Sequence, residues 1–165
     1  MMPNSKLAIS LAVLAFMFSA SPAFPESDAH KQFDQLKALE GKWVGKNSQG
    51  QPVEVTYRMT AGGSALMSEI QGHGENMVTM FHLDGERLLM THYCGAGNQP
   101  RMKAIAADAK SISFEFFDGT NIGPGAGHMQ QLTITQPDAD HHTEAWVFLD
   151  HGQNIKELFS LERAK

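Results

Sequence analysis

The sequence predicts an all-β protein: an antiparallel up-and-down barrel of about ten strands with one short N-terminal helix. Short β-type runs follow one another along the chain, and several alternate apolar and polar residues, as in VEVTYRM at 53–59. Glycine, proline, asparagine and aspartate separate these runs at close to the spacing of about 8–12 residues typical of sandwiches and barrels. No helical period recurs after Gly41, and sequential hairpins without helical crossovers favour an up-and-down barrel over a Greek-key sandwich.

The first 23 residues have the composition of a secretory signal peptide. Lys6 supplies a small positive region, an apolar run follows at 7–20, and Ser21 and Ala23 are the small residues of a cleavage site. The run is shorter than the roughly 20 residues that a spanning helix needs, so we expect no stable membrane anchor. We therefore expect an exported protein, periplasmic or secreted, with a single mature domain at residues 24–165.

The composition of residues 24–165 excludes some partners and one kind of stabilisation. Without Lys6, 12 basic residues stand against 18 acidic ones, a net charge of −6 with neutral histidines. No basic patch is evident, so we expect no nucleic-acid partner. Cys94 is the only cysteine, so the fold has no intrachain disulfide and must be held by burial.

The expected elements follow in order along the chain. A helix is expected within residues 30–41, where Phe33, Leu36 and Leu39 recur at helical spacing and Gly41 is a stop signal. We expect strands at 42–47, 52–60, 64–71, 75–83, 86–94, 101–107, 111–117, 128–135, 142–149 and 153–162. The glycine-rich segment at 119–127 is followed by a strand and has no Gly-Lys-Ser/Thr, so we interpret it as a turn or a portal loop rather than a phosphate loop.

The hairpin around Asp84 and Gly85 decides which side chains face the interior. This pair predicts a two-residue type I′ turn, in which Met77 opposes His92. The more apolar face of the hairpin is expected to line the interior, whereas His82 and Tyr93 face outward. The expected inward residues are Met77, Thr79, Phe81, Leu83, Leu88, Met90, His92 and Cys94.

His92 and Cys94 are the residues that most suggest chemistry. Side chains two apart on a strand share a face, but their backbones lie about 6.5–7 Å apart. A Cys–His nucleophile pair needs hydrogen-bond contact and an orienting group, for which Asn98 is the one candidate nearby. We therefore expect His92 to be a hydrogen-bonded histidine of a cavity and Cys94 a small buried residue, and we predict no catalytic residue.

No dedicated metal site is expected. The sequence has no HExxH or CxxC motif, and His82 and His92 lie on opposite faces of one hairpin. Paired carboxylates for acid–base catalysis are not evident either, and we expect most of the acidic residues on the strands to lie on solvated outer faces. The acidic strand residues in question are Glu69, Glu115, Glu144 and Glu157.

Asn98 and Arg101 allow two interpretations. In one, the segment at 95–100 is a turn and Arg101 is a surface residue that opens the next strand. In the other, the loop folds over a barrel end and Arg101 pairs with a ligand carboxylate or packs on Trp43.

The segment LKALEGKWVG, in which a short helix leads into Gly41-x-Trp43, resembles the opening of the calycins: lipocalins, fatty-acid-binding proteins and nitrobindin-like proteins. The strings VTYRMTAGGSAL, MVTMFHLDGERLLMTHYC and GNQPRM resemble bacterial secreted lipocalin-like proteins of uncharacterised function. The resemblance implies that Trp43, with Gly41, is structural and closes the base of the barrel, with an arginine such as Arg101 packed on it. It also implies a cavity for a small apolar ligand. As in nitrobindin-like barrels, haem held by His92 or by a late histidine, with a related isomerase activity, is an alternative.

We predict a secreted barrel that binds a small hydrophobic or amphipathic molecule and is not an enzyme. No cofactor is expected apart from the haem alternative, and the other alternative is a filled core with a structural or interaction role. The expected ligand-binding residues are His92, Cys94, Met90, Met77, Phe81, Arg101 and Asn98.

Overall fold

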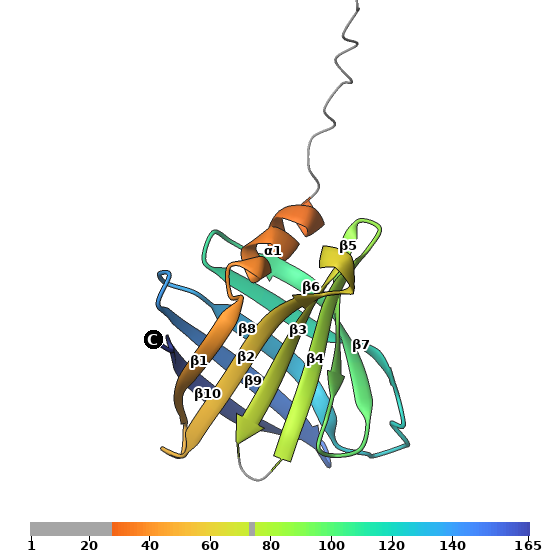
Figure 1. Ribbon diagram of the computed structural model, residues 1–165. Helices are drawn as coiled ribbons and strands as arrows, with labels where there is room; N and C mark the ends of the chain where they lie inside the picture. Colours follow the sequence, from red (N-terminus) through yellow and green to blue (C-terminus); the bar gives the residue numbers. More distant parts are fainter. Residues whose placement is uncertain (1–27, 73–74) are drawn as a thin grey trace, which may run out of the picture.

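The computed structural model describes residues 28–72 and 75–165, so the expected signal peptide at 1–23 lies outside the described residues. The described part contains the helix α1 (Asp28–Lys37), the short 3₁₀ turn η1 (Ala61–Gly63) and ten strands (Figure 1). The strands are β1 (Gly41–Asn47), β2 (Pro52–Thr60), β3 (Ala65–Gly72), β4 (Glu75–Asp84), β5 (Arg87–Tyr93), β6 (Gln99–Ala107), β7 (Ser111–Thr120), β8 (His128–Thr135), β9 (His141–Asp150) and β10 (Gln153–Arg163).

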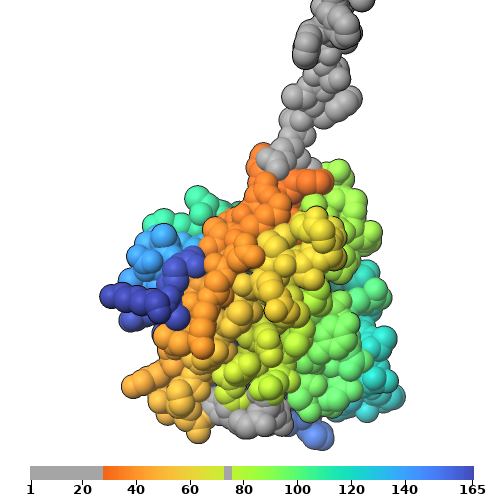
Figure 2. Space-filling view, viewed as in Figure 1, coloured from red at the N-terminus to blue at the C-terminus, as the bar shows by residue number. Residues whose placement is uncertain are grey.

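The ten strands form one closed antiparallel barrel. Each strand pairs with its neighbours in sequence, and β1 closes the barrel by pairing with β10. This confirms the predicted fold class. Closure leaves no strand edge unpaired around the barrel. On the face shown in Figure 2, the outer side chains of β1 to β4 form a continuous wall beneath α1.

The hairpin of β4 and β5 has the predicted faces but a different register. The two central residues of the turn are Gly85 and Glu86, because Asp84 pairs with Arg87, and only Gly85 has a positive φ, of 58°. A glycine at the first central position is typical of a type II′ turn rather than the predicted I′ turn. Thr79, and not Met77, therefore opposes His92. The shift is an even number of residues, so the inward and outward faces are unchanged.

The loops next to β6 are shorter than expected. Gln99 and Pro100 belong to β6 and pair with Thr120 and Gly119, which extends β7 beyond its expected end. A Cβ atom at Gly119 would lie 2.9 Å from the carbonyl oxygen of Gln99, so the lack of a side chain there permits this close pairing.

The helix ends before the predicted stop at Gly41. Residues 38–40 continue as a tighter turn, in which Leu39 N–H donates to the Leu36 carbonyl at 3.0 Å. Gly41 is instead the first residue of β1, with a φ of 127°. Phe33 and Leu36 are buried beneath the helix, and α1 lies at one end of the barrel (Figure 1). No helix in the described part of the chain is long and apolar enough to cross a membrane.

Trp43 occupies the end of the barrel next to α1. Its side chain is fully buried, and its indole N–H donates to the Leu39 carbonyl at 2.7 Å. The guanidinium of Arg163 lies 4.2 Å from the Trp43 ring centre and donates to the carbonyls of Ala38 and Glu40. The arginine on Trp43 is thus Arg163, and the alternative that placed Arg101 there is wrong.

Candidate functional site

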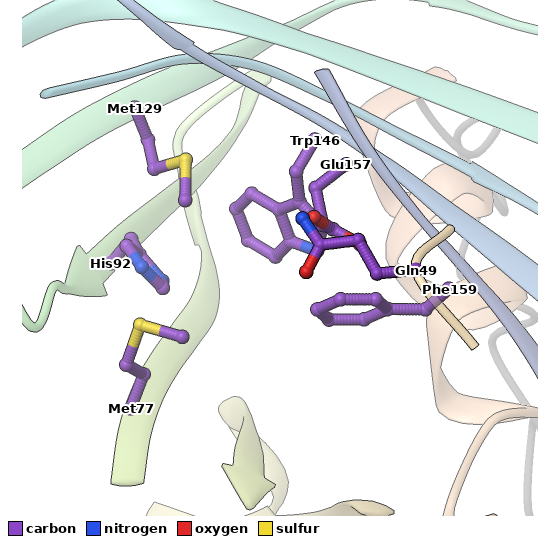
Figure 3. A pocket seen from close by; sticks show the side chains of 7 residues that line it. All are labelled: Gln49, Met77, His92, Met129, Trp146, Glu157 and Phe159. Carbon is purple, nitrogen blue, oxygen red and sulfur yellow. The ribbon is translucent and has the colours of Figure 1, made fainter. Parts of the chain in front are cut away.

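A cavity of about 250 Å³ lies at the end of the barrel away from α1. It reaches the exposed side chain of Gln49 in the turn between β1 and β2. Its walls are mostly apolar, and they come from β4, β5, β8, β9 and β10 (Figure 3). The lining residues are Gln49, Met77, His92, Met129, Trp146, Glu157 and Phe159.

His92 is the buried polar group of this cavity. Its Nδ1 and the hydroxyl of Thr79, directly opposite on β4, form a hydrogen bond of 2.9 Å. Its Nε2 is buried and has no hydrogen-bond partner among the described residues. Burial lowers the pKa of His92 to about 4, although the negative charge of Glu144 acts in the opposite direction. The imidazole is therefore neutral at neutral pH, and Nε2 is available for a partner in the cavity.

Trp146 forms the wall that faces His92. The two ring centres are 4.9 Å apart and the planes are inclined by 44°. The indole N–H of Trp146 donates to Oε2 of Glu144 at 3.0 Å, which fixes the orientation of the ring. The cavity wall is thus anchored to a buried carboxylate behind it.

Glu144 is the centre of a polar cluster in the barrel interior. Its side chain is about 1% exposed, and its Oε1 accepts the hydroxyl of Tyr57 at 2.6 Å and faces Nε2 of His142 at 3.3 Å. Burial raises the pKa of Tyr57, and the charge and hydrogen bond of Glu144 raise it further. The His142 ring packs edge-on against Trp43, with 4.3 Å between ring centres. Most of the strand carboxylates were expected on solvated outer faces, and Glu144 is an exception because it is buried in the interior.

The predicted ligand-binding residues do not all meet at the cavity. His92 and Met77 line it, and the prediction that His92 faces inward is confirmed. Phe81 and Met90 also face inward but are packed in the core, outside the cavity lining. Cys94 follows the end of β5, is half-buried and does not line the cavity.

Asn98 and Arg101 also lie outside the cavity lining. Asn98 is buried, and its amide donates to the Gly127 carbonyl at 2.7 Å, so it ties two turns together. Arg101 is an outward-facing residue whose Nε donates to Asp118 at 2.6 Å. The interpretation of Arg101 as a surface residue at the start of a strand is the correct one.

Sequence reasoning missed most of the cavity wall: Met129, Trp146, Phe159, Gln49 and Glu157. One signal was present in β9, where His142, Glu144 and Trp146 recur at the two-residue period of a strand. A tryptophan faces the core far more often than it faces solvent, and its neighbours at this period share its face.

Within residues 28–72 and 75–165, no group of three or more His, Cys, Asp and Glu side chains is arranged to hold a metal ion. The site therefore offers one neutral imidazole, two thioethers and two aromatic rings, with Gln49 and Glu157 as its other polar side chains. Such a set can bind an apolar group and pair with one polar atom.

The sequence matches no protein-family model and no curated protein. Among the solved structures that are similar in fold are these two. One is a protein of unknown function from the DUF3598 family of Nostoc punctiforme, 11% identical, with a TM-score of 0.57 over 78% of this chain. This chain spans 49%, about half, of that protein's length. The other is Rv2717c from M. tuberculosis, 16% identical, with a TM-score of 0.53 over 84% of this chain and 99% of that one. At these identities the similarity shows the fold alone.

The fold and the site thus define a closed ten-stranded β-barrel with a mostly apolar cavity at the end away from its helix.

Proposed function

We propose that this protein is an exported, calycin-like barrel that binds a small, largely apolar molecule carrying one polar group. The observation that carries the proposal is Nε2 of His92, a buried polar atom at a mostly apolar wall, without a partner among the described residues. An unpaired buried polar atom costs about 1–3 kcal/mol, and a ligand hydroxyl or carbonyl at this point removes that cost.

The size of the cavity limits the ligand. Sites that bury drug-sized molecules measure about 300–1,000 Å³, and this cavity measures about 250 Å³. An apolar cavity of about 150 Å³ is enough to bind benzene. A ligand with one aromatic ring or a short alkyl chain therefore fits, and a filled core is less well supported.

Haem, the cofactor that the resemblance to nitrobindin-like barrels implies, does not fit the described residues. A haem macrocycle needs a much wider cavity than this one, which measures about 250 Å³. None of the late histidines lines the cavity: His141 and His151 are on the surface, and His142 is packed against Trp43. We therefore do not propose haem binding or an isomerase activity that depends on it.

The proposal is tested by comparing benzyl alcohol with toluene, which differ by one hydroxyl. Isothermal titration should show saturable binding of both to the wild-type protein, with the alcohol bound more tightly. His92→Phe keeps a ring at this position but removes the nitrogen, so the preference for the alcohol should fall about tenfold, equivalent to about 1.4 kcal/mol. His82→Phe, on the outer face, should leave the preference unchanged. The absence of saturable binding would contradict the proposal, and so would a preference for the alcohol in His92→Phe that is as large as in the wild-type protein.

Export is tested separately. Expression of the whole chain in a bacterial host, followed by N-terminal sequencing of protein from the periplasmic fraction, should give Phe24 as the first residue. Recovery of the uncleaved chain from the cytosol would contradict this part of the proposal.

A further inference from the structure

One wall of the cavity carries a set of donor atoms that binding of an apolar molecule does not explain. In Figure 3, Met77 and Met129 lie on either side of His92, and Phe159 lies on the other side of the cavity. The Trp146 ring contacts His92, with 4.9 Å between the ring centres. Met77, His92 and Met129 come from different strands, β4, β5 and β8, so the closed barrel brings them together.

The pairing of β4 and β5 explains why Met77 reaches His92. Thr79 opposes His92, and Met77 lies two residues earlier on the same face. Met77 is therefore a diagonal neighbour of His92, about 7–8 Å away at the backbone, a separation that a long side chain and a ring can bridge. Methionine is flexible, so its sulfur can adapt to a partner.

Thr79 can orient His92 as a metal ligand. When Nδ1–H donates to the Thr79 hydroxyl, Nε2 carries the free lone pair of a ring that lines the cavity. Histidines that bind metals almost always donate their second ring nitrogen to an oxygen acceptor in this way.

The surroundings of these donors favour a cation of low charge. Glu157 is the charged side chain that lines the cavity, and Glu144 lies behind the Trp146 ring. The face of an indole attracts a cation through its quadrupole. Trp146 is held in place by its bond to Glu144, so a cation beside His92 also lies beside a fixed aromatic ring.

We propose that Met77, His92 and Met129 bind a soft monovalent metal ion, Cu(I), through two thioether sulfurs and one imidazole nitrogen. Soft thioether donors select Cu(I), whereas calcium and magnesium require oxygen ligands. Zinc sites use thiolate, imidazole and carboxylate groups, and a divalent ion would bring twice the charge into this apolar cavity. Zinc-type motifs contain no methionine, which is why their absence from the sequence does not exclude this site.

The test is an anaerobic titration of the purified protein with Cu(I) in competition with a chromogenic Cu(I) chelator. One equivalent should bind, and the fluorescence of Trp146 should be quenched. Methyl-¹³C methionine NMR should show shifts for Met77 and Met129 and for no other described methionine. Ag(I), a similar ion that does not change oxidation state, should give the same shifts.

Matched variants separate this site from other sulfur atoms. Met77→Leu and Met129→Leu should each weaken Cu(I) binding at least tenfold. Met67→Leu and Met80→Leu, a cross-strand pair on the outer face, should have no effect. Cys94→Ala should also have no effect, because Cys94 does not line the cavity. Loss of binding in Cys94→Ala, shifts confined to outer methionines, or no stoichiometric binding would overturn the proposal.

This inference goes beyond the proposed function, and the two fail independently. The wild-type protein is titrated separately with Cu(I) and with benzyl alcohol, so each kind of binding is read on its own. Met77→Leu/Met129→Leu replaces the thioethers by apolar groups of similar volume and should no longer bind Cu(I). If the double variant does not fold, the methionine shifts of the wild-type protein decide the question alone. If the wild-type protein binds benzyl alcohol but not Cu(I), only the metal site is contradicted. If it binds Cu(I) but not the alcohol, only the proposed function is contradicted.

Discussion

At the scale of single residues, burial of His92 links the site to stability. Its pKa is lowered to about 4, whereas a histidine in an unfolded chain has a pKa of about 6.5. The unfolded state therefore binds more protons than the folded state between these two values. The contribution of neutral His92 to the free energy of unfolding is fully present above about pH 6.5, and it is lost as the pH falls towards 4. The difference corresponds to about 3 kcal/mol.

We predict that His92→Gln removes this part of the pH dependence. Urea unfolding of the wild-type protein and the variant should be compared at several values between pH 4 and pH 7. The difference in unfolding free energy between them should change by about 3 kcal/mol across this interval. His82→Gln, on the outer face, should give a curve parallel to that of the wild type. A curve for His92→Gln that runs parallel to the wild type would show that His92 does not titrate as its burial requires.

The hydroxyl of Tyr57 provides a second prediction at this scale. It donates to the buried carboxylate of Glu144 at 2.6 Å, and a hydrogen bond to a charged group contributes about 1.5–3 kcal/mol. Tyr57→Phe should lower the free energy of unfolding by about 2 kcal/mol. The chain has one other tyrosine, Tyr93, which is 50% exposed. Tyr93→Phe should change stability by less than about 0.5 kcal/mol, and equal effects of the two changes would contradict the assigned role of the cluster.

At the scale of elements, the sequence was informative because each strand has its own local signals. Alternation and turn residues indicated all ten strands, and the face of His92 followed from the two-residue period of β5. The register between β4 and β5 was not predictable from Asp84 and Gly85, because this pair suits two turn types that differ in which residues are central. Closure of the barrel brings Met129 to the same cavity as His92, and this contact between distant strands has no local signal.

The seam between β1 and β10 provides the element-scale prediction. A Cβ atom at Gly45 would overlap the backbone carbonyl of Ser160 on β10. Gly45→Ala must therefore separate the two strands, and overpacking of this kind costs about 1–3 kcal/mol. Gly123 is the matched control, because it does not have a positive φ and a Cβ atom there meets nothing within 4 Å. Denaturant unfolding should show a lower midpoint for Gly45→Ala and an unchanged midpoint for Gly123→Ala.

At the scale of the whole molecule, the barrel has two different ends. At one end, α1, Trp43 and the bound guanidinium of Arg163 close the interior. At the other, the cavity extends to Gln49. The Glu144 cluster lies between them, because it contacts both Trp146 at the cavity and His142 beside Trp43. Glu144 therefore links the closed end of the barrel to the Trp146 ring in the cavity wall and helps to hold that ring in place.

The same topology predicts the order of folding. Hairpins between consecutive strands are local, whereas β1 and β10 lie at opposite ends of the described chain and must meet to close the barrel. Bringing distant segments together costs chain entropy before their contacts form, so we expect the seam to form after the transition state. Leu161, in β10, pairs with Gly45, and Leu88 lies in the local hairpin of β4 and β5; each is 2% exposed.

Leu161→Ala and Leu88→Ala should each destabilise the protein by about 2–5 kcal/mol, but they should do so through different rates. Stopped-flow folding and unfolding in urea should show that Leu161→Ala mainly accelerates unfolding, since its contacts are absent from the transition state. For Leu88→Ala, a larger fraction of the lost stability should appear as slower folding than for Leu161→Ala, because the hairpin of β4 and β5 forms early. If Leu161→Ala slows folding as much as Leu88→Ala does, β1 and β10 meet before the transition state, and closure of the barrel is an early step.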